Sequence, residues 1–373
     1  MAEGIRGTFR IRYGLAALAC AAFFMHSADA GAAKKKKKPS PAKKAQSATL
    51  PPSAPKAFSP PPEADLRARV EWATKEADGM RKSLALSPRD EGLRTSLGAL
   101  AVIVASDLER ALSVGDIANA TALRKLVEQK LADTRWRLGL LGRQGSGGGY
   151  FALGVMSLHG ILGERDPDIA CTMFASAWDK HYSDAAYRLS DCVAKADPAR
   201  ASSLLTTAAE SGHALASELV GRRCLEASPP DTQCAFTRVS AAAAAGRASA
   251  KSLLGWMYAQ GAGTGADPKR ALSLYLEAAD AGDLSALNNL GELYETGRAV
   301  APDPARAVEY YTKASEGGLP AAQFNLGRMY AAGNGIDRDH AKARLWLSAA
   351  LKGGVQPAQK ILDWMDSAEA QKR

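Results

Sequence analysis

The sequence predicts an all-α protein in which helical hairpins stack side by side into a solenoid. The main observation is a nine-residue segment, NLGELYETG at 289–297, that returns 36 residues later as NLGRMYAAG and stands 36 residues earlier as LLGWMYAQG. Its landmarks define three consecutive blocks of equal length, 248–283, 284–319 and 320–355. A fixed period of this size is typical of stacked repeats, because one hairpin cannot bury its apolar face alone.

Each block is expected to contain two helices joined by a loop. In the second block one helical stripe is apolar, formed by Ala286, Leu290, Leu293 and Tyr294. Gly291 beside this stripe has no side chain and lets a neighbouring helix approach closely. Gly297 stands where a helix end favours a left-handed residue. Asp303, followed by proline, is typical of an N-cap and the first residue of a second helix.

These landmarks resemble the SEL1-like repeat, a variant of the tetratricopeptide family. The resemblance rests on the Ala-x3-Leu-Gly-x2-Tyr helix, the glycine-containing loop and the Asp-initiated second helix, and it is strong over 248–355. Fainter copies cover 148–246, where Ser190 replaces the helix glycine and His181 replaces a closing glycine. The resemblance implies a right-handed α-solenoid of about six repeats over 148–355, followed by a capping helix over 356–373. It also implies a surface that holds protein partners, with no catalytic residues to carry over.

Residues 1–30 are typical of an export signal. Three arginines precede an apolar run at 14–25, and Ala28 and Ala30 form an Ala-x-Ala cleavage site. We therefore expect cleavage near Ala30 and a periplasmic or secreted bacterial protein. The apolar run is too short to cross a bilayer. The lysines that follow it leave an uncleaved anchor as an alternative, and Cys20 leaves lipidation as another.

Residues 31–62 are expected to form a disordered Lys/Pro-rich linker. Their eight lysines, with no acid, supply +8 of the net charge of +9. The remainder of the chain is nearly neutral and lacks the charge bias of a nucleic-acid-binding domain. The cluster from Lys34 to Lys38 is expected either to be a solvated spacer or to contact an anionic envelope surface weakly.

Residues 63–143 are predicted to form three helices. The first has a narrow apolar seam: Leu66, Val70, Ala73, Ala77, Met80 and Leu84. Ser87 is expected to start the second helix, and Gly115 and Asp116 separate the second from the third. The segment GSGGGY at 145–150 is interpreted as a hinge. The region would be either an added helical layer or a self-association element.

The sequence predicts no catalytic, metal or cofactor site. The glycine-rich segment at 261–265 follows a helix rather than a strand and lacks the lysine of a phosphate-binding loop. Ser-x-x-Lys matches at 40–43 and 53–56 fall within the linker, with no site around them. The five histidines are scattered, and none has metal-ligand spacing to acids or thiols.

Four cysteines lie in the fainter repeats. In an exported protein an even number of cysteines favours disulfides, and four cysteines allow three pairings. The preferred pairing joins Cys171 to Cys192 between adjacent hairpins and Cys224 to Cys234 across one hairpin loop. We therefore expect no free thiol among these four.

The leading hypothesis for function is a non-catalytic scaffold or adaptor in the bacterial cell envelope that binds a protein or peptide in a concave groove. One alternative is a membrane-anchored cytoplasmic regulator with the same repeats. Another is an envelope enzyme acting on cell-wall polymer, for which no acid/base or nucleophile arrangement is found.

The predicted partner-binding residues are those left on the first helices once the packing positions are removed. Trp256, Glu292 and Arg328 directly follow the Leu-Gly pair in successive hairpins, and Asn289 and Asn325 directly precede the Leu. First helices line the concave face of tetratricopeptide-like solenoids, so these residues would form one row, and Trp and Arg are favoured interface anchors. The alternative for Trp256 is packing against the next hairpin.

Overall fold

The computed structural model describes residues 56, 58–62, 65–87, 91–161 and 164–370. Within these ranges the regular secondary structure is helical, with no strand. The described residues belong to one compact unit that begins at Pro52. The predicted export signal and most of the predicted linker lie outside the described residues.

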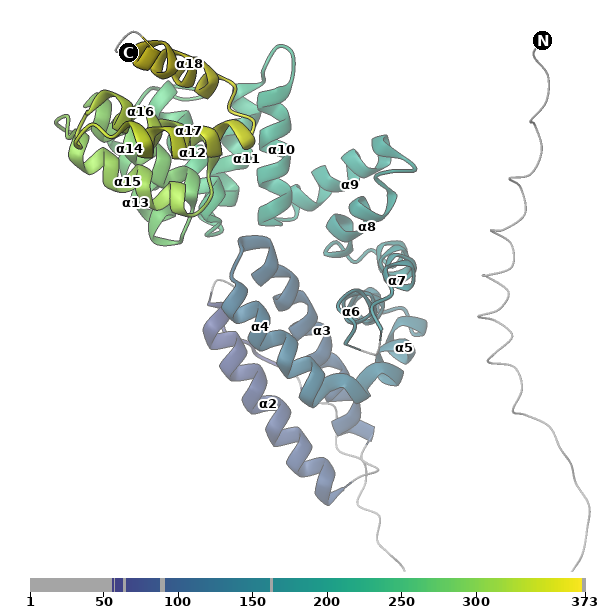
Figure 1. Ribbon diagram of the computed structural model, residues 1–373. Coiled ribbons are helices and arrows are strands. Elements are labelled where there is room, and N and C mark those ends of the chain that lie inside the picture. The colour runs from purple at the N-terminus through teal and green to yellow at the C-terminus, as the bar shows by residue number, and fades with distance from the viewer. Residues whose placement is uncertain (1–55, 57, 63–64, 88–90, 162–163, 371–373) are drawn as a thin grey trace, which may run out of the picture. The chain divides into compact units, whose positions relative to one another are not determined.

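Six hairpins follow one another along the chain, each with a first and a second helix (Figure 1). They are α6 (Gly147–Leu158) with α7 (Pro167–Asp179), α8 (Ala185–Val193) with α9 (Pro198–Glu210), α10 (Ala214–Glu226) with α11 (Thr232–Ala244), α12 (Ala248–Gln260) with α13 (Pro268–Asp280), α14 (Leu284–Thr296) with α15 (Pro304–Glu316), and α16 (Pro320–Ala332) with α17 (His340–Lys352). Each second helix also packs against the next first helix, and a last helix, α18 (Pro357–Ala370), packs on α17. The all-α hairpin solenoid predicted from the 36-residue period is confirmed.

The glycine of each Leu-Gly pair makes room for a bulky side chain of the second helix. A Cβ atom on Gly291 would lie 2.5 Å from the Tyr311 ring, and one on Gly255 would lie 2.7 Å from the Tyr275 ring. Tyr311 is fully buried in this position. The repeated glycine is therefore a packing position, as the sequence predicts, because a side chain there would push the two helices of the hairpin apart.

The turns of the hairpins have the predicted chemistry. Asp303 caps α15, its Oδ1 accepting the backbone N–H of Arg306 at 3.0 Å. Gly297 ends α14 with a left-handed φ of 72°. His181 adopts a φ of 58° between α7 and α8, the region that the closing glycines of the later hairpins adopt. His181 therefore replaces a closing glycine in conformation as well as in position.

The N-terminal region contains one more helix than predicted. Its helices are α2 (Leu66–Leu86), α3 (Glu91–Val114), α4 (Ile117–Leu126) and α5 (Arg135–Arg143), with a π-helical segment at Val127–Leu131 and a 3₁₀ turn at Ala132–Thr134 between α4 and α5. The apolar stripe of the predicted third helix, formed by Leu123, Leu126, Val127 and Leu131, is buried, but it ends in the π-helical segment, after which a 3₁₀ turn leads to α5. Asp116 caps α4 by accepting the N–H of Asn119 at 3.0 Å.

The prediction of a hinge at 145–150 is wrong. Gly147, Gly148 and Gly149 form the first turn of α6 and are buried. A Cβ on Gly148 would lie 2.7 Å from Cγ1 of Val102, and one on Gly149 would lie 2.7 Å from the carbonyl oxygen of Leu138. These glycines therefore allow α3 and α5 to approach α6 closely. One apolar core continues from α2 to α10, so residues 65–143 are a helical layer packed on the first hairpins.

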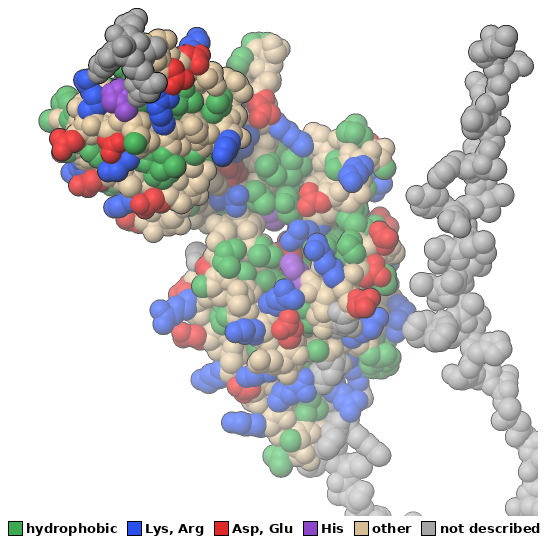
Figure 2. All heavy atoms as spheres, viewed as in Figure 1, with side chains coloured by type: hydrophobic (Ala, Val, Ile, Leu, Met, Phe, Trp, Pro, Cys, Tyr) green, Lys and Arg blue, Asp and Glu red, His purple; other side chains and the backbone are tan. Residues whose placement is uncertain are grey.

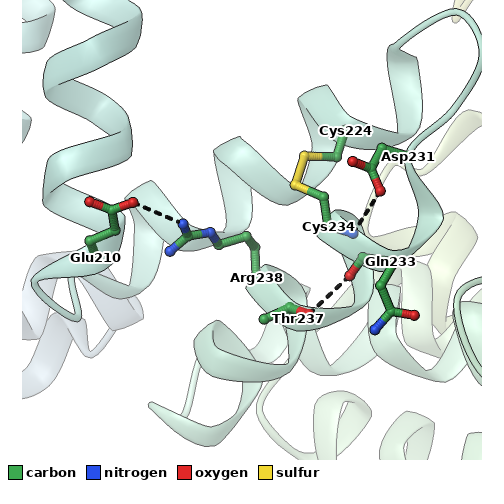
Figure 3. The surroundings of a disulfide bond; sticks show 7 residues. All are labelled: Glu210, Cys224, Asp231, Gln233, Cys234, Thr237 and Arg238. Carbon is green, nitrogen blue, oxygen red and sulfur yellow. Dashed lines mark hydrogen bonds and ion pairs between the residues drawn. A yellow bond between two sulfur atoms is a disulfide. The ribbon is translucent and has the colours of Figure 1, made fainter.

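The structure contains the two preferred cysteine pairs. Cys171 and Cys192 join α7 to α8 with a Cα–Cα distance of 5.7 Å, and Cys224 and Cys234 join α10 to α11 at 6.0 Å. Figure 3 shows the second disulfide next to the N-cap of α11, with a nearby ion pair from α11 to α9. Both cross-links lie in the earlier hairpins, between α7 and α11.

None of the described helices is both long and apolar enough to span a membrane.

Candidate functional site

The residues that flank the Leu-Gly pair of each first helix form the candidate site. They occupy the same two helical positions in successive hairpins, and neighbouring first helices such as α12 and α14 are in contact. We call this set the first-helix face. From α8 to α16 its members before the Leu, or its equivalent, are Arg188, Leu219, Leu253, Asn289 and Asn325, and those after the pair are Asp191, Arg222, Trp256, Glu292 and Arg328.

A hollow of about 340 Å³ lies on this face between α10, α12 and α14. Trp256 and Leu253 of α12 line it together with Arg222 of α10 and Asn289 of α14. Trp256 is 39% exposed, although its neighbours in the helix are buried. This geometry favours the groove interpretation of Trp256 over packing against the next hairpin. It also brings two of the five predicted residues, Trp256 and Asn289, into one site.

The other predicted residues do not line this hollow. Arg328 donates a hydrogen bond to Glu295 of the preceding hairpin at 2.7 Å, and Asn325 donates to Asn288 at 3.0 Å. Both side chains therefore connect α16 to α14. Glu292 is exposed and lies outside the lining of the hollow.

The hydrogen-bond partners of Glu295 stabilise the ionised form of its carboxylate. Burial raises its pKa, but the hydrogen bonds from Arg328 and from the Tyr311 hydroxyl, at 3.0 Å, outweigh burial and lower the pKa below its ordinary value. Such charge-assisted hydrogen bonds are stronger than neutral ones. Arg328 is therefore held in a structural contact between two hairpins.

Over the early hairpins the first-helix face is covered by α3. Figure 1 shows α3 beside α6, and the two helices pack closely, with further contacts from α3 to α10. Arg188 of α8 donates a hydrogen bond to Oε2 of Glu109 on α3 at 2.6 Å, and the Glu109 side chain is only 7% exposed. Arg188 occupies the repeat position of Asn289 and Asn325. The repeat position that is half-buried at Asn289 and Asn325 thus contacts α3 of the same chain at Arg188.

Glu218 connects the end of α3 to the hollow. Its buried carboxylate accepts hydrogen bonds from Arg222 at 2.8 Å and from the Ser249 hydroxyl at 2.7 Å, and it also pairs with Arg247. Arg247 in turn donates to the carbonyl oxygen of Ser113 in α3 at 2.7 Å. Burial raises the pKa of Glu218, but these hydrogen bonds outweigh it and lower the pKa. The carboxylate therefore fixes the orientation of Arg222 at the edge of the hollow.

A polar cavity of about 210 Å³ lies between α3 and the turns before α8 and α10, and its lining includes Glu109 and His213. The His213 ring stacks on Tyr187 with 4.3 Å between ring centroids, and its Nδ1 accepts the N–H of Ala216 at 3.2 Å. Burial lowers the pKa of His213 to about 4. A neutral imidazole held in this way caps α10 and has a structural role at this interface.

The described residues contain no group of three or more His, Cys, Asp or Glu side chains placed to hold a metal ion.

The fold and the repeated positions define an α-solenoid of helical hairpins. The Sel1 repeat family matches the chain at 148–179, 248–283, 284–319 and 320–355, and the chain is therefore a Sel1-like repeat protein. Three of the four matches coincide with the blocks defined by the 36-residue period. Repeats of this family typically mediate protein–protein interaction, and the family is generally non-catalytic.

Solved structures support this assignment. A protective antigen present in uropathogenic Escherichia coli strains, which displays an SLR fold, is 25% identical with a TM-score of 0.50, and the match covers 60% of this chain and 50% of that chain. The match thus spans about half the length of the E. coli protein. A Sel1 repeat protein from Oxalobacter formigenes is 24% identical with a TM-score of 0.51, over 65% of this chain and 96% of that chain, which supports the fold. A comparison with curated proteins found no match.

Sequence reasoning missed the contacts of Arg188 and Glu109. Glu109 follows the run LGALAVIVAS on α3, and Arg188 precedes the Leu of the α8 repeat. A buried charge requires a partner of opposite charge. Aligning Arg188 with Asn289 would have placed an arginine on the first-helix face. The acids Asp107 and Glu109 directly follow the apolar run on α3, so either could have been proposed as its buried partner.

Proposed function

We propose that this chain is a non-catalytic scaffold in the bacterial cell envelope that binds a protein or peptide partner on the first-helix face of α10 to α14. The observation that carries the proposal is the hollow around Trp256, a residue that is 39% exposed on a surface where its helix neighbours are buried. Trp and Arg are enriched among the few residues that dominate the binding energy of protein interfaces.

The contact between α3 and the early hairpins supports the same use of this face. There the repeat position before the Leu carries Arg188, which binds Glu109 of a packed helix. In the later hairpins the corresponding positions are Leu253 and Asn289, and both line the hollow. The later face thus offers an apolar contact from Leu253 and Trp256 beside polar groups from Asn289 and Arg222, which suits a peptide segment with an apolar side chain.

The disulfides support an oxidising compartment for this function. Cysteine pairs such as Cys171–Cys192 and Cys224–Cys234 persist in secreted and periplasmic proteins and are rare in the cytosol. The proposal therefore places the repeats outside the cytoplasm, in agreement with the predicted export signal at 1–30. A membrane-anchored cytoplasmic regulator would require these thiols to remain reduced.

Replacing Trp256 by Ala should weaken binding of the partner by more than about 1 kcal/mol, roughly fivefold in Kd, with little change in melting temperature. The reason is that the ring contributes contact area to the hollow and little to the core. Titration of the partner with both proteins, and thermal unfolding of each, would measure the two effects.

The matched control is Leu276→Ala, which truncates a 38% exposed side chain on the second helix α13. This change should leave the affinity unaltered. A loss of stability of about 3 kcal/mol in Trp256→Ala would identify Trp256 as a junction residue and end the groove assignment.

A further inference from the structure

Helix α3 crosses the early hairpins in the order in which they follow one another along the chain. Its contacts, from its N-terminal to its C-terminal part, are Val102 with Gly148 of α6, Ser106 with Tyr182 before α8, Glu109 with Arg188 of α8, and Ser113 with Arg247 before α12. The α3 residues are spaced by four, three and four positions, so they form one stripe of the helix. A helix therefore lies lengthwise on the early hairpins and presents one face to them.

A hollow of about 760 Å³ continues from the C-terminal end of α3 towards the later hairpins. Val114 and Gly115 line it at this end, and Figure 1 shows the end of α3 next to α10. Beyond α3 the lining includes Ala214 of α10, Ala248 of α12 and Ala281 before α14. Such small side chains allow a helix to pack closely. The surface that follows α3 thus has room for a second helix.

Arg222 of α10 lies at the edge of the hollow around Trp256, which is formed by the same three helices. Its side chain is 46% exposed, and its Nε and Nη2 donate to Oε1 of Glu218 at 2.9 and 2.8 Å. Glu218 also pairs with Arg247, so these three side chains carry one net positive charge. The guanidinium has five N–H groups, and no hydrogen bond from it to another of the described residues is present. Its remaining donors can therefore bind a carboxylate of a partner.

The acidic residue in the lining of the same hollow, Asp283, already has a role. It caps α14 by accepting the N–H of Ala286 at 2.7 Å, where the positive end of the helix dipole stabilises its charge. Figure 2 shows basic and acidic side chains interspersed over the hairpins in this view. Selection of an acidic partner would therefore depend on the oriented guanidinium of Arg222 and not on the charge of the whole surface.

We propose that the partner presents an amphipathic helix to this surface, with an acidic side chain paired to Arg222 and an apolar side chain in the hollow against Trp256. The inference rests on the proposed function, because it specifies the partner of the same site. Within the chain α3 is the example: Glu109 pairs with Arg188, and Val102, two helical turns away on the same stripe, packs on α6. Binding of one face of an amphipathic helix in a groove is a general mode of recognition.

A photoreactive amino acid at position 285 would capture the partner and leave Arg222 and Trp256 unchanged. Ser285 is exposed and lines the hollow from α14. The chain would be produced in the native host and irradiated, and digestion of the adduct with mass spectrometry would locate the captured segment. A synthetic peptide of this segment, about 20 residues long or roughly 30 Å as a helix, is the probe for the binding measurements.

The peptide should gain helical circular dichroism when it binds the purified chain. Its affinity should fall about fivefold or more for Arg222→Gln, measured by fluorescence anisotropy, and should be partly kept for Arg222→Lys. Replacing the acidic residue of the peptide by Gln should weaken binding to the parent chain by a similar factor. The same replacement should have little effect on binding to Arg222→Gln, since the pair is already broken.

The matched control is Arg223→Gln, which removes the neighbouring exposed arginine of α10. The Arg223 guanidinium donates to the Ser202 hydroxyl at 3.4 Å, and Arg223 is not part of the lining of the hollow. This variant should bind the peptide as the parent chain does. Thermal unfolding of each variant checks that it is folded, and Arg222→Gln leaves Glu218 paired with Arg247.

Two results would overturn the inference and leave the proposed function standing. One is a peptide that binds without gaining helix, which would identify an extended segment as the occupant. The other is a helical peptide that binds the parent chain and Arg222→Gln equally well. An adduct with a second copy of the chain would also overturn it and assign the surface to self-association. The absence of an adduct from position 285 and from position 256 would contradict the proposed function itself.

Discussion

Replacing Arg188 by Met should lower the free energy of unfolding by about 3–5 kcal/mol. Arg188 is the cation that donates to Oε2 of Glu109 at 2.6 Å, and the Glu109 side chain is 7% exposed. Without Arg188 a carboxylate would remain buried between α3 and α8, with His159, whose Nε2 lies 3.5 Å away, beside it. Denaturant unfolding monitored by circular dichroism would measure the change.

Two further variants make this result specific. Replacing both partners, Glu109→Leu with Arg188→Met, should recover most of the lost stability, since buried pairs can be exchanged for apolar residues at little cost. Arg238→Met breaks the more exposed pair with Glu210, 3.3 Å apart, and should cost less than about 1 kcal/mol. A loss below 1 kcal/mol in Arg188→Met would contradict the docking of α3 on the early hairpins.

Lowering the pH from about 7 to about 4 should destabilise the protein through His213. Burial lowers the pKa of His213 to about 4 in the folded state, whereas an unfolded histidine has a pKa near 6.5. The unfolded state therefore takes up a proton that the folded state excludes, so stability is lost as the pH falls through this window. The two pKa values differ by about 2.5, so the loss should reach about 2–3 kcal/mol.

The charged groups around His213 influence this titration in known directions. Glu109 raises its pKa, and Arg188 and Arg247 lower it. Glu109 and Glu218 have pKa values below the ordinary 4.5 of a glutamate, so their own contributions begin to be lost near pH 4.5 and overlap only the acidic end of the histidine window. The decrease between about pH 6.5 and about pH 5 can therefore be assigned to His213 by mutation.

His213→Asn should flatten the dependence of stability on pH in this window. Asn keeps an N-cap acceptor for α10 but does not titrate. The matched control is His181→Asn, which replaces an exposed histidine in a left-handed conformation that Asn also adopts. It should keep the slope of the unaltered protein. Identical slopes for the unaltered protein and His213→Asn would contradict the burial of a neutral His213.

The repeated hairpins could be predicted because their determinants are local. The Leu-Gly pair, the loop glycine and the Asp-Pro start recur every 36 residues, and each encodes a contact or a turn within one hairpin. The packing of Tyr311 under Gly291 is an example, since both residues belong to the same block.

The arrangement of the N-terminal layer could not be predicted in the same way, since its contacts join residues far apart in the sequence. Glu109 and Arg188 are 79 residues apart, and Ser113 and Arg247 are 134 residues apart. Gly147 to Gly149 illustrate the same limit, because a glycine run is typical of both flexibility and close helix packing. Only the positions of Val102 and Leu138 show which applies.

The candidate site was predicted only in part for a similar reason. Arg328 and Asn325 share repeat positions with Trp256 and Asn289, yet they bind Glu295 and Asn288 of the preceding hairpin. The sequence identifies the face on which these side chains lie. Which of them are engaged by a neighbouring hairpin depends on the side chains that this neighbour presents.

The central claim is that the first-helix face beyond α3 holds a protein partner, and site-directed photo-crosslinking tests it most directly. A photoreactive amino acid would be placed in separate chains at position 256, on the first-helix face, and at position 276, at the exposed Leu276 of the second helix α13. Both chains would be produced in the native host and irradiated. The account predicts one protein adduct that forms from position 256 and is absent from position 276. An adduct that forms equally from both positions, or from position 276 alone, would contradict it.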